Sequence, residues 1–282
     1  SDFDSSGNDV IELNGAWEFY WERLLYPADF KGQAPVPDGY SQGLVPWNTI
    51  QTRGATGANG YATYRLRVLL PENPPGMGIR ISFQNSSFRL FVNGQEAALS
   101  GGPGTTEADT VPARINRIVY FQPDERELEI ILHVANFYIF RGGLRGSIQL
   151  GTAETIEGLR NRGLVLDLIM AGFALCIWLY HLFLFLQRPQ DRSILYFLFL
   201  SGSFLPRYFL ISERTLSLMI GELPFDFEIR MIHSLHVMTP SLLLLFMRSI
   251  FPESIPRRTV LFFFLSTLLY FGTWFFSPQV YT

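Results

Sequence analysis

Apolar and polar residues alternate with a period of two through much of the first 150 positions. Tyr64, Leu66 and Val68 alternate with threonine and arginine, so their side chains fall on one face of an extended strand. The same period recurs over residues 11–19, 79–83, 88–92, 128–134 and 148–150. Because strands of this kind bury one face and leave the other in water, we predict a β-rich N-terminal domain.

Turn and loop signals separate these strands. The dipeptide Asn93-Gly94 follows one strand directly and favours the positive φ angles of a two-residue hairpin turn. Residues 95–116 predict a long loop, with Gly-Gly-Pro-Gly at 101–104, and long loops on a rigid scaffold often carry function. Short alternating strands between Gly- and Pro-rich loops are typical of a jelly roll or another β-sandwich.

Beyond residue 163 the alternation gives way to long apolar runs. A helix needs about 20 apolar residues to cross the hydrocarbon core of a bilayer. Four runs are long enough to predict membrane spans, at residues 164–186, 194–212, 231–250 and 259–276. We therefore predict a multidomain membrane protein with a β-domain over residues 1–152, a polar connector over 153–163 and a helical transmembrane bundle over 164–282.

Arginines in the short loops predict the orientation of the bundle. Arg188 and Arg192 follow the first span, and Arg257 and Arg258 follow the third. In an alternating topology both loops lie on one side, which the positive-inside rule makes cytoplasmic. The acidic segment between spans two and three and the β-domain then share the opposite side.

Composition and charge narrow the function classes. Hydrophobic residues make up 48% of the chain and charged residues 17%, below the roughly one quarter charged that soluble domains carry. The net charge of −3 gives no basic surface for nucleic acid. The sequence contains no phosphate-binding glycine loop and no nucleophile elbow, and its one cysteine, Cys176, has no adjacent catalytic histidine. We expect no enzymatic activity and no cofactor in this chain.

Two sets of motifs resemble one known family. In the β-domain they are LNGAWEFYW (13–21), LLYPADF (24–30), VPW (45–47), GYATYRL (60–66), FVNG (91–94) and ANF (135–137) through RGG (141–143). In the membrane half they are LYHLFLFL (179–186) and DRSILYF (191–197). In this order, over nearly the whole chain, they resemble the extracytoplasmic jelly roll and first helices of bacterial seven-transmembrane receptors with diverse intracellular signalling modules.

The resemblance implies a receptor of the bacterial cytoplasmic membrane with its N-terminal domain in the periplasm. Since that family has seven spans and a cytoplasmic output module, we expect this chain to be a fragment that stops after about four spans. The jelly roll also resembles the galactose-binding-like domain of family 2 glycoside hydrolases, which implies a carbohydrate or another small polar ligand. A membrane-anchored carbohydrate-binding module without signalling output is the alternative, and a homodimer stays open.

Four residues are the candidates for ligand contact. Trp47 follows Pro46 in a loop, where its ring either contacts ligand or caps the core. Asn136, Tyr138 and Arg141 lie on a glycine-rich bend, and a planar guanidinium suits hydroxyl or carboxylate groups. The bend either contacts ligand or membrane, or packs on the top of the helical bundle.

Charged residues in the spans give the candidates for coupling across the membrane, and the histidines are considered as metal ligands. Arg207 lies near the outer end of the second span, where it either snorkels to the interface or pairs with Asp167 of the first span. A pair of this kind would join two helices just below the sensor domain. His181, His233 and His236 have no carboxylate or cysteine at ligand spacing, so we predict interhelical or interfacial hydrogen bonds rather than a metal site.

Overall fold

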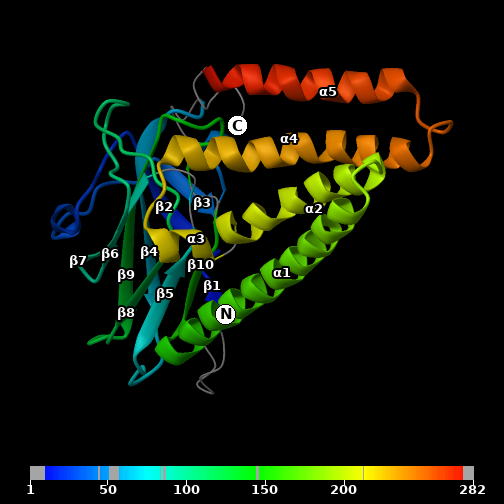
Figure 1. The fold of residues 1–282 in the computed structure, drawn as a ribbon. Helices are drawn as coiled ribbons and strands as arrows, with labels where there is room; N and C mark the ends of the chain where they lie inside the picture. Colours follow the sequence, from blue (N-terminus) through cyan, green and yellow to red (C-terminus); the bar gives the residue numbers. More distant parts are fainter. Residues whose placement is uncertain are drawn as a thin grey trace. The chain divides into compact units, whose positions relative to one another are not determined.

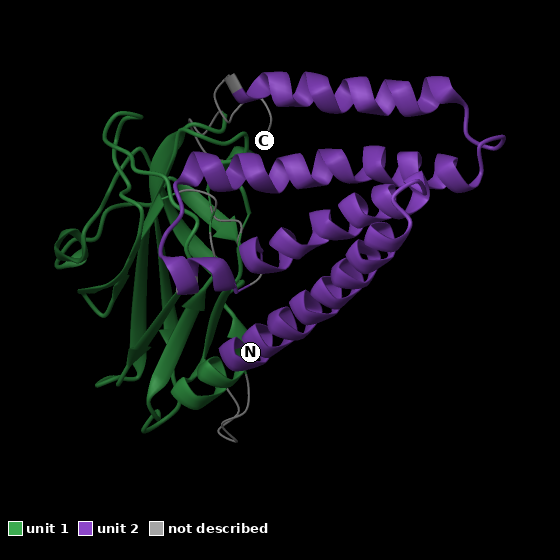
Figure 2. Ribbon diagram, viewed as in Figure 1, with its two compact units in different colours: residues 1–159 green, residues 160–282 purple. Residues whose placement is uncertain are grey.

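The computed structural model describes residues 10–43, 45–50, 57–82, 84, 87–143, 146–211 and 213–275. The chain forms two compact units, residues 1–159 and residues 160–282 (Figure 2). Unit 1 contains the strands and unit 2 most of the helical residues (Figure 1).

Unit 1 is a sandwich of two antiparallel sheets, which confirms the predicted fold. The four-stranded sheet has the order β1 (Ile11–Glu12), β10 (Ile148–Thr152), β5 (Met77–Ile81) and β8 (Arg117–Phe121). The six-stranded sheet has the order β3 (Gly39–Gln42), β2 (Ala16–Trp21), β4 (Gly60–Leu69), β9 (Glu127–Asn136), β6 (Ser87–Val92) and β7 (Gln95–Ser100).

The core of the sandwich consists of the apolar residues of the period-two pattern. Trp17, Phe19 and Tyr64 are fully buried, and Tyr64 lies opposite the equally buried Leu132 across β4 and β9. The intervening residues of these strands face away from this core. The turn at Asn93-Gly94 is confirmed, because both residues have positive φ, 47° and 83°, in the connection between β6 and β7.

The structure corrects one expectation about the β-domain and leaves one residue of another outside the described residues. Residues 95–116 were predicted to be a loop throughout, and this is wrong for the first six residues, which form β7. The backbone there pairs with β6 although few of its side chains are buried. The alternating pattern at 79–83 forms β5, but Phe83 lies outside the described residues.

The helical elements are α1 (Ala153–Gln187), α2 (Arg192–Leu210), α3 (Thr215–Ile220), α4 (Phe225–Ile250), α5 (Arg257–Gly272) and the 3-10 turn η3 (Thr273–Phe275). Among the described residues, α1, α2 and α4 are long and apolar enough to cross a membrane. The predicted connector forms the first turns of α1, so one helix continues from the end of β10 into the first span. The second predicted span ends at Ser212, outside the described residues. The fourth falls on α5 and η3, ends at the undescribed residue 276, and stays a prediction.

Unit 2 is built on the packing of α4 against both α2 and α5. Phe197 of α2 lies edge-on to Phe246 of α4, with ring centroids 4.9 Å apart. On the other side of α4, the hydroxyls of Ser241 and Thr267 are 2.8 Å apart and buried. Hydrogen bonds between small polar side chains are a common link between helices in membranes.

Candidate functional site

The predicted ligand residues lie at one end of the sandwich, where β9 ends at Asn136, and in the loops beside it. The loop that contains Trp47 meets the bend after β9, where the Trp47 amide donates to the Gly142 carbonyl at 3.1 Å. Pro46 and Gly143 form an isolated antiparallel bridge beside this bond. We call this region the loop end. The bend precedes β10 in the chain, whereas α1 begins after the last residue of β10.

Trp47 packs inside the sandwich and presents no face to a ligand. Its side chain is 0% exposed, its ring lies edge-on to Trp21 at 5.1 Å, and its Nε1–H donates to the Gly57 carbonyl at 3.1 Å. Gly142 packs directly on the ring, and a Cβ at this position would lie 2.1 Å from the Ala58 carbonyl oxygen. Of the two roles open for Trp47, the structure therefore gives it the capping role.

Asn136 holds the start of the bend in place. The side chain is 1% exposed, and its Nδ2 donates to the carbonyls of Ala58 and Ile139, each at 2.9 Å. Its Oδ1 accepts from the Ile139 amide at 3.2 Å. Because these bonds use both sides of the amide, Asn136 fixes the loop rather than contacting a ligand.

Tyr138 connects the bend to the long loop that follows β7. Its hydroxyl lies 3.1 Å from the Glu107 carbonyl and 3.2 Å from the Thr110 carbonyl. The bend then turns outward, so that Phe140 is 64% exposed and Arg141 is exposed. Among the described residues, Arg141 has no hydrogen-bond or ion-pair partner.

The loop end thus combines a rigid base with exposed groups. Phe140 was not singled out by the sequence, because its place in a mixed aromatic stretch gives no sign of whether it is buried. An exposed aromatic ring suits the apolar face of a sugar, and a guanidinium suits hydroxyl or carboxylate oxygens. Glu107 and Asp109, exposed on the adjacent loop, add acceptors for hydroxyl groups.

Two hollows in the sandwich lie away from these residues. One, of about 470 Å³, is lined by β1, the end of β4 and the side chain of Arg126. The other, of about 500 Å³, lies between residues 72–74 and 122–126. Neither is lined by a predicted ligand residue, so the exposed groups of the loop end do not form the wall of either hollow.

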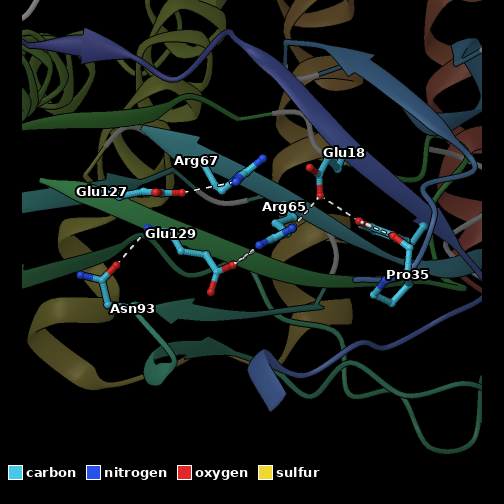
Figure 3. Close-up of polar contacts among 8 residues, drawn as sticks. Glu18, Pro35, Arg65, Arg67, Asn93, Glu127 and Glu129 are labelled. Atoms are coloured by element: carbon cyan, nitrogen blue, oxygen red, sulfur yellow. Dashed lines mark hydrogen bonds and ion pairs between the residues drawn. The ribbon is translucent and has the colours of Figure 1, made fainter. Parts of the chain in front are cut away.

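The outer face of the six-stranded sheet carries a second polar cluster (Figure 3). Arg65 of β4 lies between two carboxylates, with Nη2 2.6 Å from Glu129 of β9 and Nη1 3.2 Å from Glu18 of β2. The Tyr20 hydroxyl also donates to Glu18 at 2.8 Å, and the Arg65 guanidinium lies over the Phe30 ring at 4.4 Å. Arg65 thus pairs with both carboxylates and ties three neighbouring strands together.

Burial changes the titration of two side chains on this face. It raises the pKa of Tyr20, and the hydrogen bond and negative charge of Glu18 raise it further. It lowers the pKa of His133, although a hydrogen bond to the Leu25 carbonyl acts in the opposite direction. Both groups are therefore neutral at neutral pH.

Asp167 and Arg207, predicted as a coupling pair, have separate partners in the structure. The Asp167 carboxylate accepts from the Glu213 amide at 3.0 Å. Arg207 Nη1 lies 2.7 Å from His236 Nε2 of α4. His236 Nδ1 lies 2.7 Å from the Ile232 carbonyl and must carry its proton there, so Nε2 is the acceptor from Arg207. The direct pair between Asp167 and Arg207 is not formed.

A buried ion pair in the same unit was not predicted. Arg214 pairs with Glu228 of α4, and the two side chains are only 5% and 1% exposed. The sequence placed both residues among the charges of an outer loop, and nothing in their spacing indicates a contact between them. The ion pair can be recognised only once α2 and α4 are packed together.

The histidines of the spans form hydrogen bonds along their own helices. Nδ1 of His181 lies 2.8 Å from the Ile177 carbonyl, and Nδ1 of His233 lies 2.9 Å from the Ile229 carbonyl. Within the described part of the chain, no cluster of histidine, cysteine and carboxylate side chains is arranged to hold a metal ion.

The sandwich and the apolar helices together define a multi-pass membrane protein with a β-domain. Residues 164–282 match the family of 7TM diverse intracellular signalling domains. This part of the chain is similar to that family, and the resemblance identified from the membrane part of the sequence is confirmed.

Solved structures similar to the sandwich include the β-glucuronidase of Ruminococcus gnavus. It is 11% identical with a TM-score of 0.40, and the alignment covers 54% of this chain and 30% of the glucuronidase. Structures of that enzyme with D-glucaro 1,5-lactone and with D-glucuronic acid align with the same identity and TM-score, over 31% of the enzyme. No curated protein has significant similarity to the sequence.

Proposed function

We propose that the chain is the sensing and membrane-entry part of a signalling receptor. The match of residues 164–282 to a signalling family carries this proposal, and the β-sandwich supplies a domain suited to ligand capture. Output would come from a cytoplasmic module of the complete receptor. The sandwich lies in the periplasm and the helices cross the bacterial cytoplasmic membrane.

Signal transfer uses the continuity of the chain between the two units. α1 begins at Ala153, directly after β10, and runs as one helix to Gln187. A helix transmits rotation or translation along its axis better than a flexible linker does. A ligand drives the change only through its difference in affinity between two arrangements of the helices.

The ligand is a carbohydrate or a similar small polyhydroxylated molecule bound at the loop end. Phe140 supplies an aromatic face for a sugar ring, and Arg141 supplies donors for hydroxyl or carboxylate oxygens. Trp47, Asn136 and Tyr138 hold the two loops in position. This division follows from exposure, because the first pair is open to solvent and Trp47 and Asn136 are buried.

A glycan array probed with the full chain in detergent micelles or nanodiscs tests the ligand class. The array holds neutral and acidic oligosaccharides, and titration calorimetry on a retained glycan compares the wild type with Phe140→Ala and Arg141→Met. We expect each variant to weaken binding about tenfold, equivalent to about 1.4 kcal/mol. Tyr120→Ala, which truncates an aromatic residue that is 48% exposed on β8, should bind as the wild type does.

Three other results would contradict parts of the proposal. If no glycan is retained, the ligand class is wrong. If a glycan is retained equally by all variants, the site is wrong. If it binds at the loop end but leaves hydrogen exchange in α2 and α4 unchanged, the chain is an anchored carbohydrate-binding module without signalling.

A further inference from the structure

Two consecutive residues between α2 and α3 contact two different helices. The Glu213 amide donates to Asp167 of α1, and the next side chain, Arg214, pairs with Glu228 of α4. We call these four residues the polar clasp. All four are at least nine-tenths buried, with exposures of 9% for Asp167 and Glu213, 4% for Arg214 and 1% for Glu228.

The contact with α1 is close as well as polar. Gly163 lies one turn before Asp167, and a Cβ at this position would lie 2.5 Å from Glu213 Oε1. A larger residue would press on the Glu213 side chain. The glycine therefore leaves room for this side chain against α1.

The contact with α4 is a buried ion pair held by an unusual backbone conformation. Arg214 has φ 56° and ψ 48°, in the left-handed region, which arginine rarely adopts. Arg214 thus combines a left-handed backbone with a side chain that pairs with Glu228 in the first turn of α4. A charge buried without its partner is strongly destabilising, so the two residues must move together.

We propose that the polar clasp relays movement of α1 to α2 and α4, with Asp167, Arg214 and Glu228 as positioning residues. Because Glu213 and Arg214 are adjacent in the chain, displacement of Asp167 moves the backbone that carries Arg214. This role of the clasp rests on the proposed receptor function, for which it supplies the physical link between α1 and the helices α2 and α4. It replaces the direct pair between Asp167 and Arg207.

Dipolar EPR spectroscopy measures whether the clasp fixes α1 against α4. Cys176, the single cysteine, is exposed on α1 and takes the first spin label. Leu243→Cys on α4, at a side chain that is 45% exposed, takes the second. The full chain in nanodiscs should give one narrow distance distribution.

Asp167→Leu and Glu228→Gln should each broaden this distribution at least twofold. Asp167→Asn keeps an oxygen that accepts from the Glu213 amide, so it should restore the narrow distribution. Glu157→Gln on α1 and Asp226→Asn on α4 are matched controls, because both carboxylates are exposed. The melting temperature of each variant shows that it is folded.

A second label pair tests transmission rather than attachment. One alanine inserted after Gly158 turns the rest of α1 by about 100° relative to the sandwich. With labels on α2 and α4 in a Cys176→Ala background, the insertion should shift their distance, and Asp167→Leu should abolish the shift.

The relay is refuted if Asp167→Leu and Glu228→Gln leave the α1–α4 distribution unchanged. It is also refuted if Asp167→Asn behaves as Asp167→Leu does, or if the insertion shifts the α2–α4 distance without Asp167. None of these measurements uses a ligand. Failure of the relay is therefore separate from failure of the receptor function, which the glycan experiments test.

Discussion

His133 is buried on the outer face of the six-stranded sheet, beneath the segment that follows β2. Its Nε2 donates to the Leu25 carbonyl at 2.7 Å, and its ring lies edge-on to Tyr26 and Phe91. Burial is the largest cause of its lowered pKa, and the positive charge of Arg89 lowers the pKa further. The hydrogen bond to Leu25 and the charge of Asp29 only partly offset these effects.

The lowered pKa of His133 predicts a pH-dependent stability of the sandwich. Between the ordinary histidine pKa, about 6.5, and the lower folded-state pKa, the unfolded chain binds more protons than the folded chain. The free energy of unfolding should therefore fall as pH falls through this window and stay constant above it. Urea unfolding at about pH 5 and about pH 7.5 measures the difference, and His133→Gln should reduce it. An equal pH dependence in the variant would contradict this role.

Single residues show where sequence patterns stop being informative. The buried faces of β2 and β4 follow from alternation alone. Trp47 and Asn136 were given two roles, and only their exposure of 0% and 1% separates packing from ligand contact. Phe140 was missed for the same reason, because exposure depends on how a loop is held and not on residue type.

At the scale of elements, the meeting of two loops at Gly142 should control the loop end. Gly142→Ala places a methyl group against the Ala58 carbonyl and the Trp47 ring, and should lower the free energy of unfolding by about 2 kcal/mol. Gly158→Ala is the matched control, because nothing lies within 4 Å of its Cβ, and alanine favours a helix by up to about 1 kcal/mol. Chemical unfolding of both variants checks this. Equal stability of the two proteins would show that the loop adjusts freely.

The strands that the sequence missed share one property. β3, β7 and β8 lie at sheet edges, where β3 and β7 bury one residue each and β8 buries none. An edge strand keeps backbone pairing without a continuous buried face, so its side chains need not alternate. The membrane helices α1, α2 and α4 were readily predicted, because burial in hydrocarbon requires a long apolar run.

At the scale of the whole molecule, the sequence predicts the order of the parts better than their contacts. The β-domain and the apolar helices follow from patterns along the chain, and the similarity to a signalling family follows from motifs within it. The links within the bundle do not, since Asp167 and Glu228 are far apart in the sequence and are linked only through Glu213 and Arg214 in the connection after α2. Charged residues near the ends of the spans indicate that contacts between helices form there, but the sequence does not show which residues they contact.

We propose that lipid surrounds the helices and that the sandwich lies outside the cytoplasm. Single-cysteine labelling of bacterial spheroplasts with a membrane-impermeant maleimide tests it directly, in a Cys176→Ala background. Lys31 is exposed on the sandwich, and Gln190 is exposed between α1 and α2. Each is replaced by cysteine in a separate variant. We predict labelling of Lys31→Cys in intact spheroplasts and of Gln190→Cys only after the membrane is permeabilised. Labelling of Gln190→Cys alone in intact spheroplasts, or recovery of the unlabelled chain in the soluble fraction without detergent, would contradict the account.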